Sequence, residues 1–268
     1  IAAAELIAET FSSRIWKVTR EDGSLAAVKA LKPFDDVDDE LRGAWYLDWR
    51  DGHGAVRLLG RYRMDMLLEY AGTCHLTAVL NDDGDAAATE IAAEVMARLH
   101  APSQRRSPAE LQPLRERFSA LFDKALADAA SDTTSLYDEA AAIAERLLSD
   151  PQDMRPLHGD LHHDNIIDSP RGWLAIDPKG VLGDGGFDAA NLLYNPLDRD
   201  DLCLDPDRIA HMATVFSLSM GHDPRRLLDH AIAYGALSAA WHAGDRNDAD
   251  EQRELTVASA IRAVRLSF

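Results

Sequence analysis

Short apolar runs separated by turn residues dominate the first seventy positions of the chain. The runs at residues 15–18 and 25–31 are separated by Asp22-Gly23, which favours a tight hairpin because glycine accepts the positive φ that such a turn requires. Residues 35–50 begin with acidic side chains and then carry apolar ones at helical spacing, which predicts an amphipathic helix. Two further apolar runs cover residues 55–59 and 64–70. The pattern therefore predicts a small antiparallel sheet with one helix.

Beyond residue 86 the apolar positions recur at helical spacing. The predicted helical segments are residues 86–101, 110–129, 135–149, 205–219, 223–242 and 247–266. Residues 157–191 interrupt them with prolines, glycines and two short strand-like pieces at 166–167 and 173–176. Catalytic groups tend to lie in such polar loops on a rigid framework. We therefore expect two packed lobes, residues 1–70 and 71–268, with a hinge near Tyr70.

Composition and charge narrow the class of partner. The 268 residues are 46% hydrophobic and 28% charged, as in ordinary folded globular proteins. Because the net charge is −18, a nucleic acid is not expected as a partner, whereas cationic small molecules would be attracted. With two cysteines, no basic leader and no apolar run near the ~18 residues of a membrane helix, we expect a cytoplasmic protein without a membrane partner. Its oligomeric state stays open.

The most specific segment is His158-Gly159-Asp160-Leu161-His162-His163-Asp164-Asn165, followed by Ile176-Asp177-Pro178. Phosphoryl transfer requires one carboxylate to orient and deprotonate the acceptor hydroxyl, and separate oxygen ligands for a nucleotide-bound magnesium ion. The segment resembles the catalytic loop and metal-binding aspartate of the aminoglycoside phosphotransferases, which are relatives of the protein kinases. The resemblance implies that Asp160 is the base, that Asn165 and Asp177 hold Mg2+, and that His158 braces the loop backbone.

A kinase also needs a cation over the nucleotide phosphates. In Ala27-Val28-Lys29 the period-two alternation of a strand places Ala27 and Lys29 on the same face, so the ammonium group could reach the phosphates. Glu40 lies on the following predicted helix and could pair with Lys29, as kinase-like folds require. Asp39 is one residue away and could take this role instead.

Two further segments are candidates for contacts with ATP. Ser12 and Ser13 stand where protein kinases carry a glycine-rich loop, and their hydroxyl and amide groups could donate hydrogen bonds to phosphate. Residues 67–71 fall between the two predicted lobes, where the backbone near Glu69 and Ala71 could recognise adenine. ATP and Mg2+ are therefore the expected cofactors.

Details of the sequence narrow the resemblance. His163-Asp164 stands where aminoglycoside kinases usually carry a proline and a glycine. This variant of the loop resembles the streptomycin 6-phosphotransferases, with which hydroxyurea kinases are grouped. Four further segments share the resemblance: residues 40–44, 54–60, 171–174 and 198–204. The resemblance implies an α+β, protein-kinase-like bilobal fold. It also implies ATP-dependent phosphorylation of an aminoglycoside hydroxyl, specifically the 6-hydroxyl of streptomycin, which would confer antibiotic resistance.

Streptomycin carries two guanidinium groups, which carboxylates can bind in bidentate fashion. The candidate carboxylates for contacts with this cationic antibiotic are Asp160, Asp184, Asp200 and Asp201. Asp188, which opens the helical run at residues 187–194, is expected to cap that helix or to brace the catalytic loop.

Three other functions are compatible with parts of the sequence. The acceptor could be another small alcohol, such as hydroxyurea, choline or a sugar. The histidines and aspartates of residues 158–164 superficially resemble the ligands of a dinuclear metallohydrolase, although that function leaves Lys29 and Asp177 without a role. A catalytically silent kinase-like binding module is a third possibility, but the chain retains the complete set of Lys29, Asp160, Asn165 and Asp177.

Overall fold

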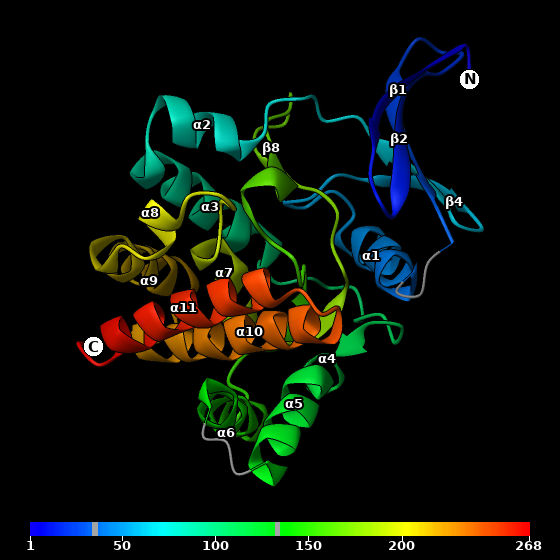
Figure 1. Cartoon of the computed structure of the whole chain (residues 1–268). Helices are drawn as coiled ribbons and strands as arrows, with labels where there is room; N and C mark the ends of the chain where they lie inside the picture. Colours follow the sequence, from blue (N-terminus) through cyan, green and yellow to red (C-terminus); the bar gives the residue numbers. More distant parts are fainter. Residues whose placement is uncertain (34–36, 132–134) are drawn as a thin grey trace.

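A five-stranded antiparallel sheet forms the N-terminal lobe of the computed structural model, which describes residues 1–33, 37–131 and 135–268 (Figure 1). The strand order is β1-β2-β3-β5-β4, and the strands are β1 Ala3–Glu9, β2 Ser13–Thr19, β3 Leu25–Leu31, β4 Leu58–Tyr62 and β5 Asp65–Glu69. The predicted hairpin is confirmed as β2 paired with β3. The sequence pattern did not indicate β1, whose seven residues are all exposed.

Helix α1, Val37–Arg50, confirms the predicted amphipathic helix within the described residues, and residues 34–36 lie outside them. Its buried face includes Glu40, Ala44 and Leu47. Gly43 lies on the same face, and a Cβ at this position would lie only 1.9 Å from the carbonyl oxygen of Pro178. The absence of a side chain at Gly43 therefore allows the N-terminal helix to pack directly on a loop of the C-terminal lobe.

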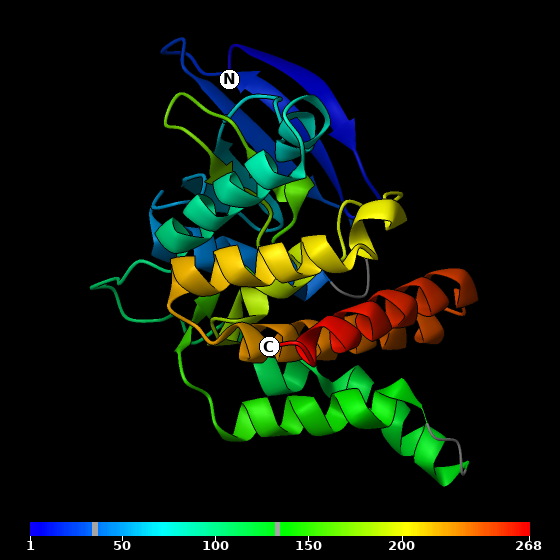
Figure 2. The same ribbon diagram turned by 90° about the vertical axis from the view of Figure 1, so that its left-hand side faces the viewer.

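Helices make up most of the C-terminal lobe. They are α2 Leu76–Asp82, α3 Asp85–Leu99, α4 Leu114–Arg117, α5 Ser119–Ala130, α6 Leu136–Ser149, α7 Phe187–Leu193, α8 Asp200–Cys203, α9 Pro206–Met220, α10 Pro224–Gly244 and α11 Asp248–Arg265. The predicted helical segments are confirmed except in residues 110–129, where residues 112–113 form a short strand and the remainder divides into α4 and α5. Figures 1 and 2 show the sheet at one end of the molecule, α5 and α6 at the other, and α10 beside α11 between them.

Sequence signals mark the starts of two long helices. Asp205 and Asp223 each precede a proline at the first helical position, and each aspartate accepts a backbone N–H two residues later, at 2.9 and 3.0 Å. Such caps satisfy amide groups that the helix itself leaves without partners. None of the helices formed by the described residues is long and apolar enough to cross a membrane.

Two small sheets flank the segment that carries the candidate chemistry. One has the strand order β6-β10-β7, with β6 Gln112–Pro113, β7 Met154–Leu157 and β10 Val181–Asp184. The other pairs the two predicted strand-like pieces, as β8 Ile166–Ile167 and β9 Leu174–Ala175. Residues 158–165 connect β7 to β8, so both ends of this loop are anchored in regular structure.

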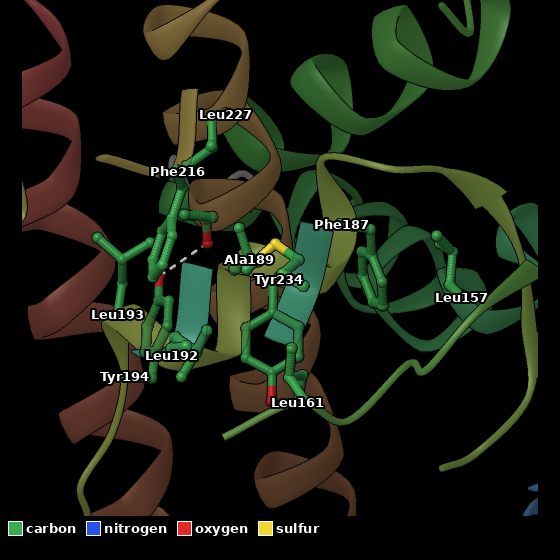
Figure 3. Close-up of a cluster of buried hydrophobic side chains, with 14 of the residues drawn as sticks. Leu157, Leu161, Phe187, Ala189, Leu192, Leu193, Tyr194, Phe216, Leu227 and Tyr234 are labelled. Atoms are coloured by element: carbon green, nitrogen blue, oxygen red, sulfur yellow. Dashed lines mark hydrogen bonds between the residues drawn. The ribbon is translucent and has the colours of Figure 1, made fainter. Parts of the chain in front are cut away.

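The loop and helix α7 rest on a packed apolar core (Figure 3). Leu161 is fully buried next to Asp160. The rings of Phe187 and Tyr234 meet edge to face with their centroids 5.8 Å apart, and the Tyr194 hydroxyl donates to the Ala231 carbonyl at 2.9 Å. Because tightly packed interiors resist displacement, this core holds the Asp160 backbone in place.

Candidate active site

Asp188 braces the start of the candidate catalytic loop, residues 158–165, from the first turn of α7. Its carboxylate accepts the backbone N–H groups of His158 and Gly159 at 3.0 and 2.8 Å, and His100 Nε2 lies 2.9 Å from it. Burial alone would raise the pKa of Asp188, but the hydrogen bonds and His100 lower it. Of the two roles expected for Asp188, the structure supports the brace.

His158 ties the same loop to the segment that carries Asp177. Its Nε2 lies 2.8 Å from the Ile176 carbonyl oxygen, and the Asp160 backbone N–H donates to its Nδ1 at 3.3 Å. Burial lowers the pKa of His158, so the ring is neutral at physiological pH. The bracing function implied by the resemblance agrees with this geometry.

Two asparagines that the sequence analysis missed orient the Asp160 carboxylate. Asn191, on α7, donates to Asp160 Oδ1 at 2.9 Å, and Asn195 donates to Asn191 Oδ1 at 2.8 Å. Both are at most 9% exposed. Their four-residue spacing was the only sequence signal, and it does not distinguish a catalytic support from an ordinary helix-end contact.

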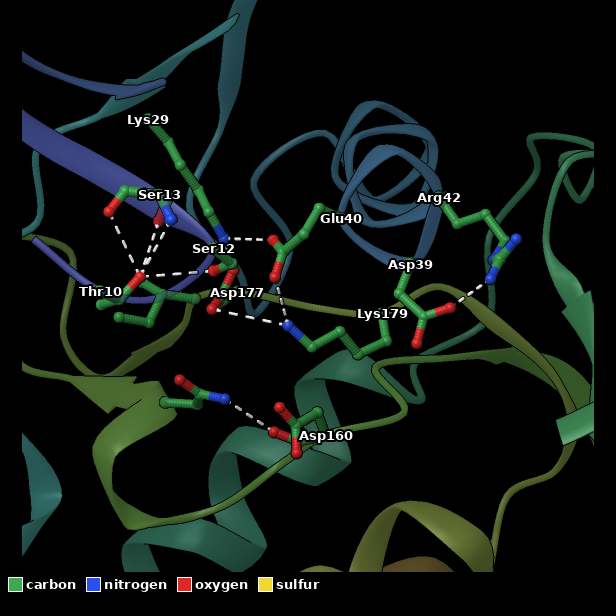
Figure 4. Close-up of polar contacts among 12 residues, drawn as sticks. Thr10, Ser12, Ser13, Lys29, Asp39, Glu40, Arg42, Asp160, Asp177 and Lys179 are labelled. Atoms are coloured by element: carbon green, nitrogen blue, oxygen red, sulfur yellow. Dashed lines mark hydrogen bonds and ion pairs between the residues drawn. The ribbon is translucent and has the colours of Figure 1, made fainter. Parts of the chain in front are cut away.

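Four charged groups from the two lobes form a closed ring of ion pairs (Figure 4). Lys29 on β3 pairs with Glu40 on α1 and with Asp177. Lys179 Nζ lies 2.8 Å from the other Glu40 oxygen and 3.8 Å from the other Asp177 oxygen. Burial alone would raise the pKa of Asp177, but the two ammonium groups lower it to about 2. The predicted Lys29–Glu40 pair is therefore present, and Lys179 joins it.

The alternative partner, Asp39, faces away from this ring. It pairs with Arg42 and, at 3.2 Å, with Arg117. Glu40 rather than Asp39 is consequently the α1 carboxylate beside Lys29, as the sequence analysis preferred.

A cavity of about 480 Å³ opens between the lobes beside this ring. Apolar side chains such as Ala27, Leu68 and Ile176 line it, and Lys29 and Asp177 occupy its polar part. This combination suits a flat base with charged phosphates, since such pockets are mostly apolar with a few orienting polar groups.

The other residues expected to bind the nucleotide lie in or next to this cleft. Glu69 and Ala71 line it, with the Glu69 carboxylate turned to Arg171 at 2.6 Å. Ser13 lines it as well, whereas Ser12 is not among the lining residues and lies in the adjoining turn. Thr10, which the sequence analysis did not consider, lines the cleft and accepts the Ser13 backbone N–H at 3.1 Å.

The donor set beside the cleft fits a magnesium ion. Asn165 donates its side-chain N–H to the Asp160 carbonyl at 2.9 Å, which leaves its amide oxygen as a possible ligand. Asn165 and Asp177 line the same cavity. Magnesium prefers such hard oxygen donors and completes its coordination with phosphate oxygens and water. Binding of Mg2+ by these two residues nevertheless stays a prediction.

A second cavity, of about 230 Å³, contains Asp160 itself. Besides the two asparagines, its lining includes Asp164, Ser238 and Glu254, and it includes no lysine or arginine. Glu254, on α11, is only 5% exposed. Burial raises its pKa to about 7, although Arg253, 2.9 Å away, offsets part of that rise. We name this cavity the acceptor pocket.

The structure does not bring the other expected substrate carboxylates into the acceptor pocket. Asp184 is 2% exposed and pairs with Arg226 at 2.6 Å, so the expectation of a substrate contact is corrected to a structural role. Asp201 pairs with Arg199 at 2.9 Å, and Asp200 pairs with Arg253 at 2.8 Å. Neither lines the pocket. Local ion pairs therefore occupy all three carboxylates.

The histidine-rich loop does not have the geometry of a dinuclear metal centre. Both ring nitrogens of His158 are engaged by backbone groups, those of Asp160 and Ile176, and His163 is buried. Within the three stretches of chain described, no group of three or more His, Cys, Asp or Glu side chains could hold a metal ion.

A sheet lobe, a helical lobe and this arrangement of charged groups define a kinase-like phosphotransferase. The family model described as "Aminoglycoside/hydroxyurea antibiotic resistance kinase" matches residues 1–246. The chain belongs to this family.

Curated relatives support the assignment over most of the chain. A streptomycin 3''-kinase of Klebsiella pneumoniae is 39% identical, over 88% of this chain and 86% of its own length. A streptomycin 6-kinase of Streptomyces glaucescens is 34% identical, over 94% and 81%. A hydroxyurea phosphotransferase of Kitasatospora aureofaciens is 33% identical, over 91% and 70%.

Solved structures confirm the expected kinase-like fold. A Plasmodium vivax ethanolamine kinase superposes with a TM-score of 0.67 at 13% identity, over 97% of this chain and 81% of that one. A thermostable mutant of the aminoglycoside phosphotransferase APH(4)-Ia, in complex with ADP and hygromycin B, gives a TM-score of 0.64 at 16% identity, over 99% and 94%. At these identities the similarity establishes the fold alone.

Proposed function

We propose that this protein transfers the γ-phosphoryl group of ATP to a hydroxyl group of streptomycin and thereby confers resistance to the antibiotic. The observation that carries the proposal is the pair of unlike cavities that residues of the candidate catalytic loop help to line. Asn165 lines the cleft that holds Lys29 and Asp177, which we name the nucleotide cleft, and Asp160 lines the acceptor pocket. An anionic donor and a cationic acceptor could therefore meet at this loop.

Each residue has a defined task in this mechanism. Lys29 neutralises nucleotide phosphates, and Asp177 with Asn165 would hold the magnesium ion, which supplies further neutralising charge. Asp160, oriented by Asn191 at 2.9 Å, accepts the proton of the acceptor hydroxyl as the phosphoryl group is transferred in line. Glu254 contributes a further carboxylate to the lining of the acceptor pocket.

The charge of the acceptor pocket favours streptomycin over an uncharged alcohol. Guanidinium groups bind carboxylates through charge-assisted hydrogen bonds, and a cleft of one sign raises the local concentration of an oppositely charged ligand. The chain's net charge of −18 acts in the same direction. Covalent attachment of a phosphate would then alter the charge and shape of the antibiotic.

Two hydroxyl groups of streptomycin are candidates for the acceptor. The sequence motifs favour the 6-hydroxyl, whereas the greater identity to the 3''-kinase, 39% against 34% for a 6-kinase, favours the 3''-hydroxyl. Both hydroxyls neighbour a cationic substituent, so an acidic pocket suits either. NMR of the purified phosphorylated product distinguishes the two positions.

Hydroxyurea is a second candidate acceptor, because a hydroxyurea phosphotransferase is 33% identical over 91% of this chain. The deciding experiment measures ADP formation with Mg-ATP and a panel of streptomycin, other aminoglycosides and hydroxyurea. The proposal predicts turnover that requires streptomycin and disappears in Asp160→Asn. Turnover of hydroxyurea but not of streptomycin would replace the proposed acceptor.

A further inference from the structure

Lys179 has a position that the proposed mechanism does not use. It follows Asp177 by two residues, and its ammonium group completes the ring of ion pairs (Figure 4). Each Glu40 oxygen has its own ammonium partner, Lys29 on one and Lys179 on the other. Two members of the ring belong to each lobe, so the ring joins the lobes beside the nucleotide cleft.

The backbone around Lys179 is fixed against α1. The N–H of Lys179 donates to the His158 carbonyl at 2.7 Å. In the preceding residue, the Pro178 carbonyl occupies the space that a Cβ at Gly43 would need. The following residue, Gly180, has a φ of +66°, and a Cβ there would lie 2.6 Å from the Arg42 carbonyl oxygen. With 17% of its side chain exposed, Lys179 is thus a preorganised group rather than a mobile surface lysine.

Ligands bound in the cleft would compete with members of this ring for their charged partners. Nucleotide phosphates would compete with Glu40 and Asp177 for Lys29, and a magnesium ion would compete with the lysines for Asp177. The contact between Lys179 and Glu40 needs neither of the groups that the ligand would engage. It can therefore persist and keep α1 on the metal-binding loop.

We propose that Lys179 is a positioning residue for the nucleotide: it holds Glu40, and through Glu40 it holds Lys29, in register with the phosphates. The inference rests on the nucleotide-binding part of the proposed function and is independent of the acceptor's identity. Loss of Lys179 would leave one oxygen of the buried Glu40 carboxylate without its charged partner, so nucleotide affinity should fall by roughly ten- to a hundredfold.

The test is calorimetric titration with Mg-ADP and with a non-hydrolysable Mg-ATP analogue. Lys179→Met should weaken binding of both nucleotides by about tenfold, and Lys179→Arg should restore most of the loss, because the charge is kept. Lys124→Met is the matched control, since Lys124 pairs with Asp128 on α5, outside the nucleotide cleft and the ring. It should bind nucleotide as the wild type does.

A double-mutant cycle separates positioning through Glu40 from a general loss of stability. If Lys179 acts through Glu40, the losses of nucleotide affinity in Glu40→Gln and Lys179→Met should be strongly non-additive. Additive losses would overturn the inference, as would an affinity of a folded Lys179→Met within twofold of wild type. If Lys179→Met does not fold, unchanged binding by Lys179→Gln would overturn it equally. Absence of nucleotide binding in the wild type would instead reject the proposed function.

Discussion

Residues of one loop, at positions 158–165, line both the nucleotide cleft and the acceptor pocket, but the two cavities differ in charge and in origin. The cleft is lined from both lobes and holds Lys29, whereas the acceptor pocket belongs to the C-terminal lobe and has carboxylates without lysine or arginine in its lining. The difference matches the two proposed reactants, an anionic nucleotide and a cationic antibiotic. Residues of a single loop thus contribute to two cavities of unlike charge.

Asp160 is the proposed general base, so its loss should have the largest effect. Asp160→Asn keeps the size of the side chain but removes the base, which typically contributes about 10²–10⁴-fold to the rate. We expect kcat to fall by about this factor in a steady-state ADP-release assay, while nucleotide affinity stays near the wild-type value. A decrease of less than about tenfold would deny Asp160 the role of general base.

Loss of Lys29 should weaken the binding of nucleotide and leave the binding of the acceptor nearly unchanged. Lys29→Met removes a charge-assisted contact to phosphate, so KM for ATP should rise about 10–100-fold. KM for streptomycin at saturating ATP should change by less than about threefold, because Lys29 does not line the acceptor pocket. An equal rise in both constants would show that the two cavities are not independent.

Loss of Glu254 should weaken the binding of the acceptor and leave the binding of nucleotide nearly unchanged. Its pKa of about 7 means that the carboxylate is largely protonated at pH 6 and largely ionised at pH 8. KM for the cationic acceptor should therefore fall as the pH rises through 7, and Glu254→Gln should raise KM at pH 8 by about tenfold.

The difference between the two pH profiles isolates the contribution of Glu254. His162 and His242 also line the pocket, but they are the same in both proteins. If the profile of Glu254→Gln follows that of the wild type, Glu254 does not bind the cation.

The smallest effect is expected at Asp201, which was a substrate candidate from the sequence. It is paired with Arg199 on the surface, and such exposed pairs contribute about 0–1 kcal/mol. Asp201→Asn should leave both Michaelis constants within about twofold of wild type. A tenfold rise in KM for streptomycin alone would extend the acceptor site to α8.

Burial of apolar side chains decided which elements of the fold could be predicted from the sequence. Most long helices were predictable because each buries an apolar face at helical spacing, whereas β1 was missed because it is exposed along its whole length. The candidate catalytic and metal-binding residues, Asp160, Asn165 and Asp177, could be proposed because they lie within one short segment of the kind that phosphoryl transfer requires, and their roles stay predictions. Lys29 and Glu40 followed from strand and helix periodicity together with the family resemblance, and the structure confirms that the two side chains form an ion pair.

The acceptor pocket could not be predicted in this way. Asn191 and Glu254 lie on α7 and α11, and only the packing of those helices brings them near Asp160. Asp184 was assigned wrongly because, in the sequence, a carboxylate paired with a buried arginine looks the same as one facing a ligand. The tertiary partner that distinguishes them, Arg226, is 42 positions away.

The proposed function is tested most directly by NMR of streptomycin after incubation with the purified protein and Mg-ATP. We expect one new phosphate ester, on the 6- or the 3''-hydroxyl, formed in equal amount to the ADP released. Unmodified streptomycin, with no ADP above the level of Asp160→Asn, would rule out the proposed phosphoryl transfer to streptomycin.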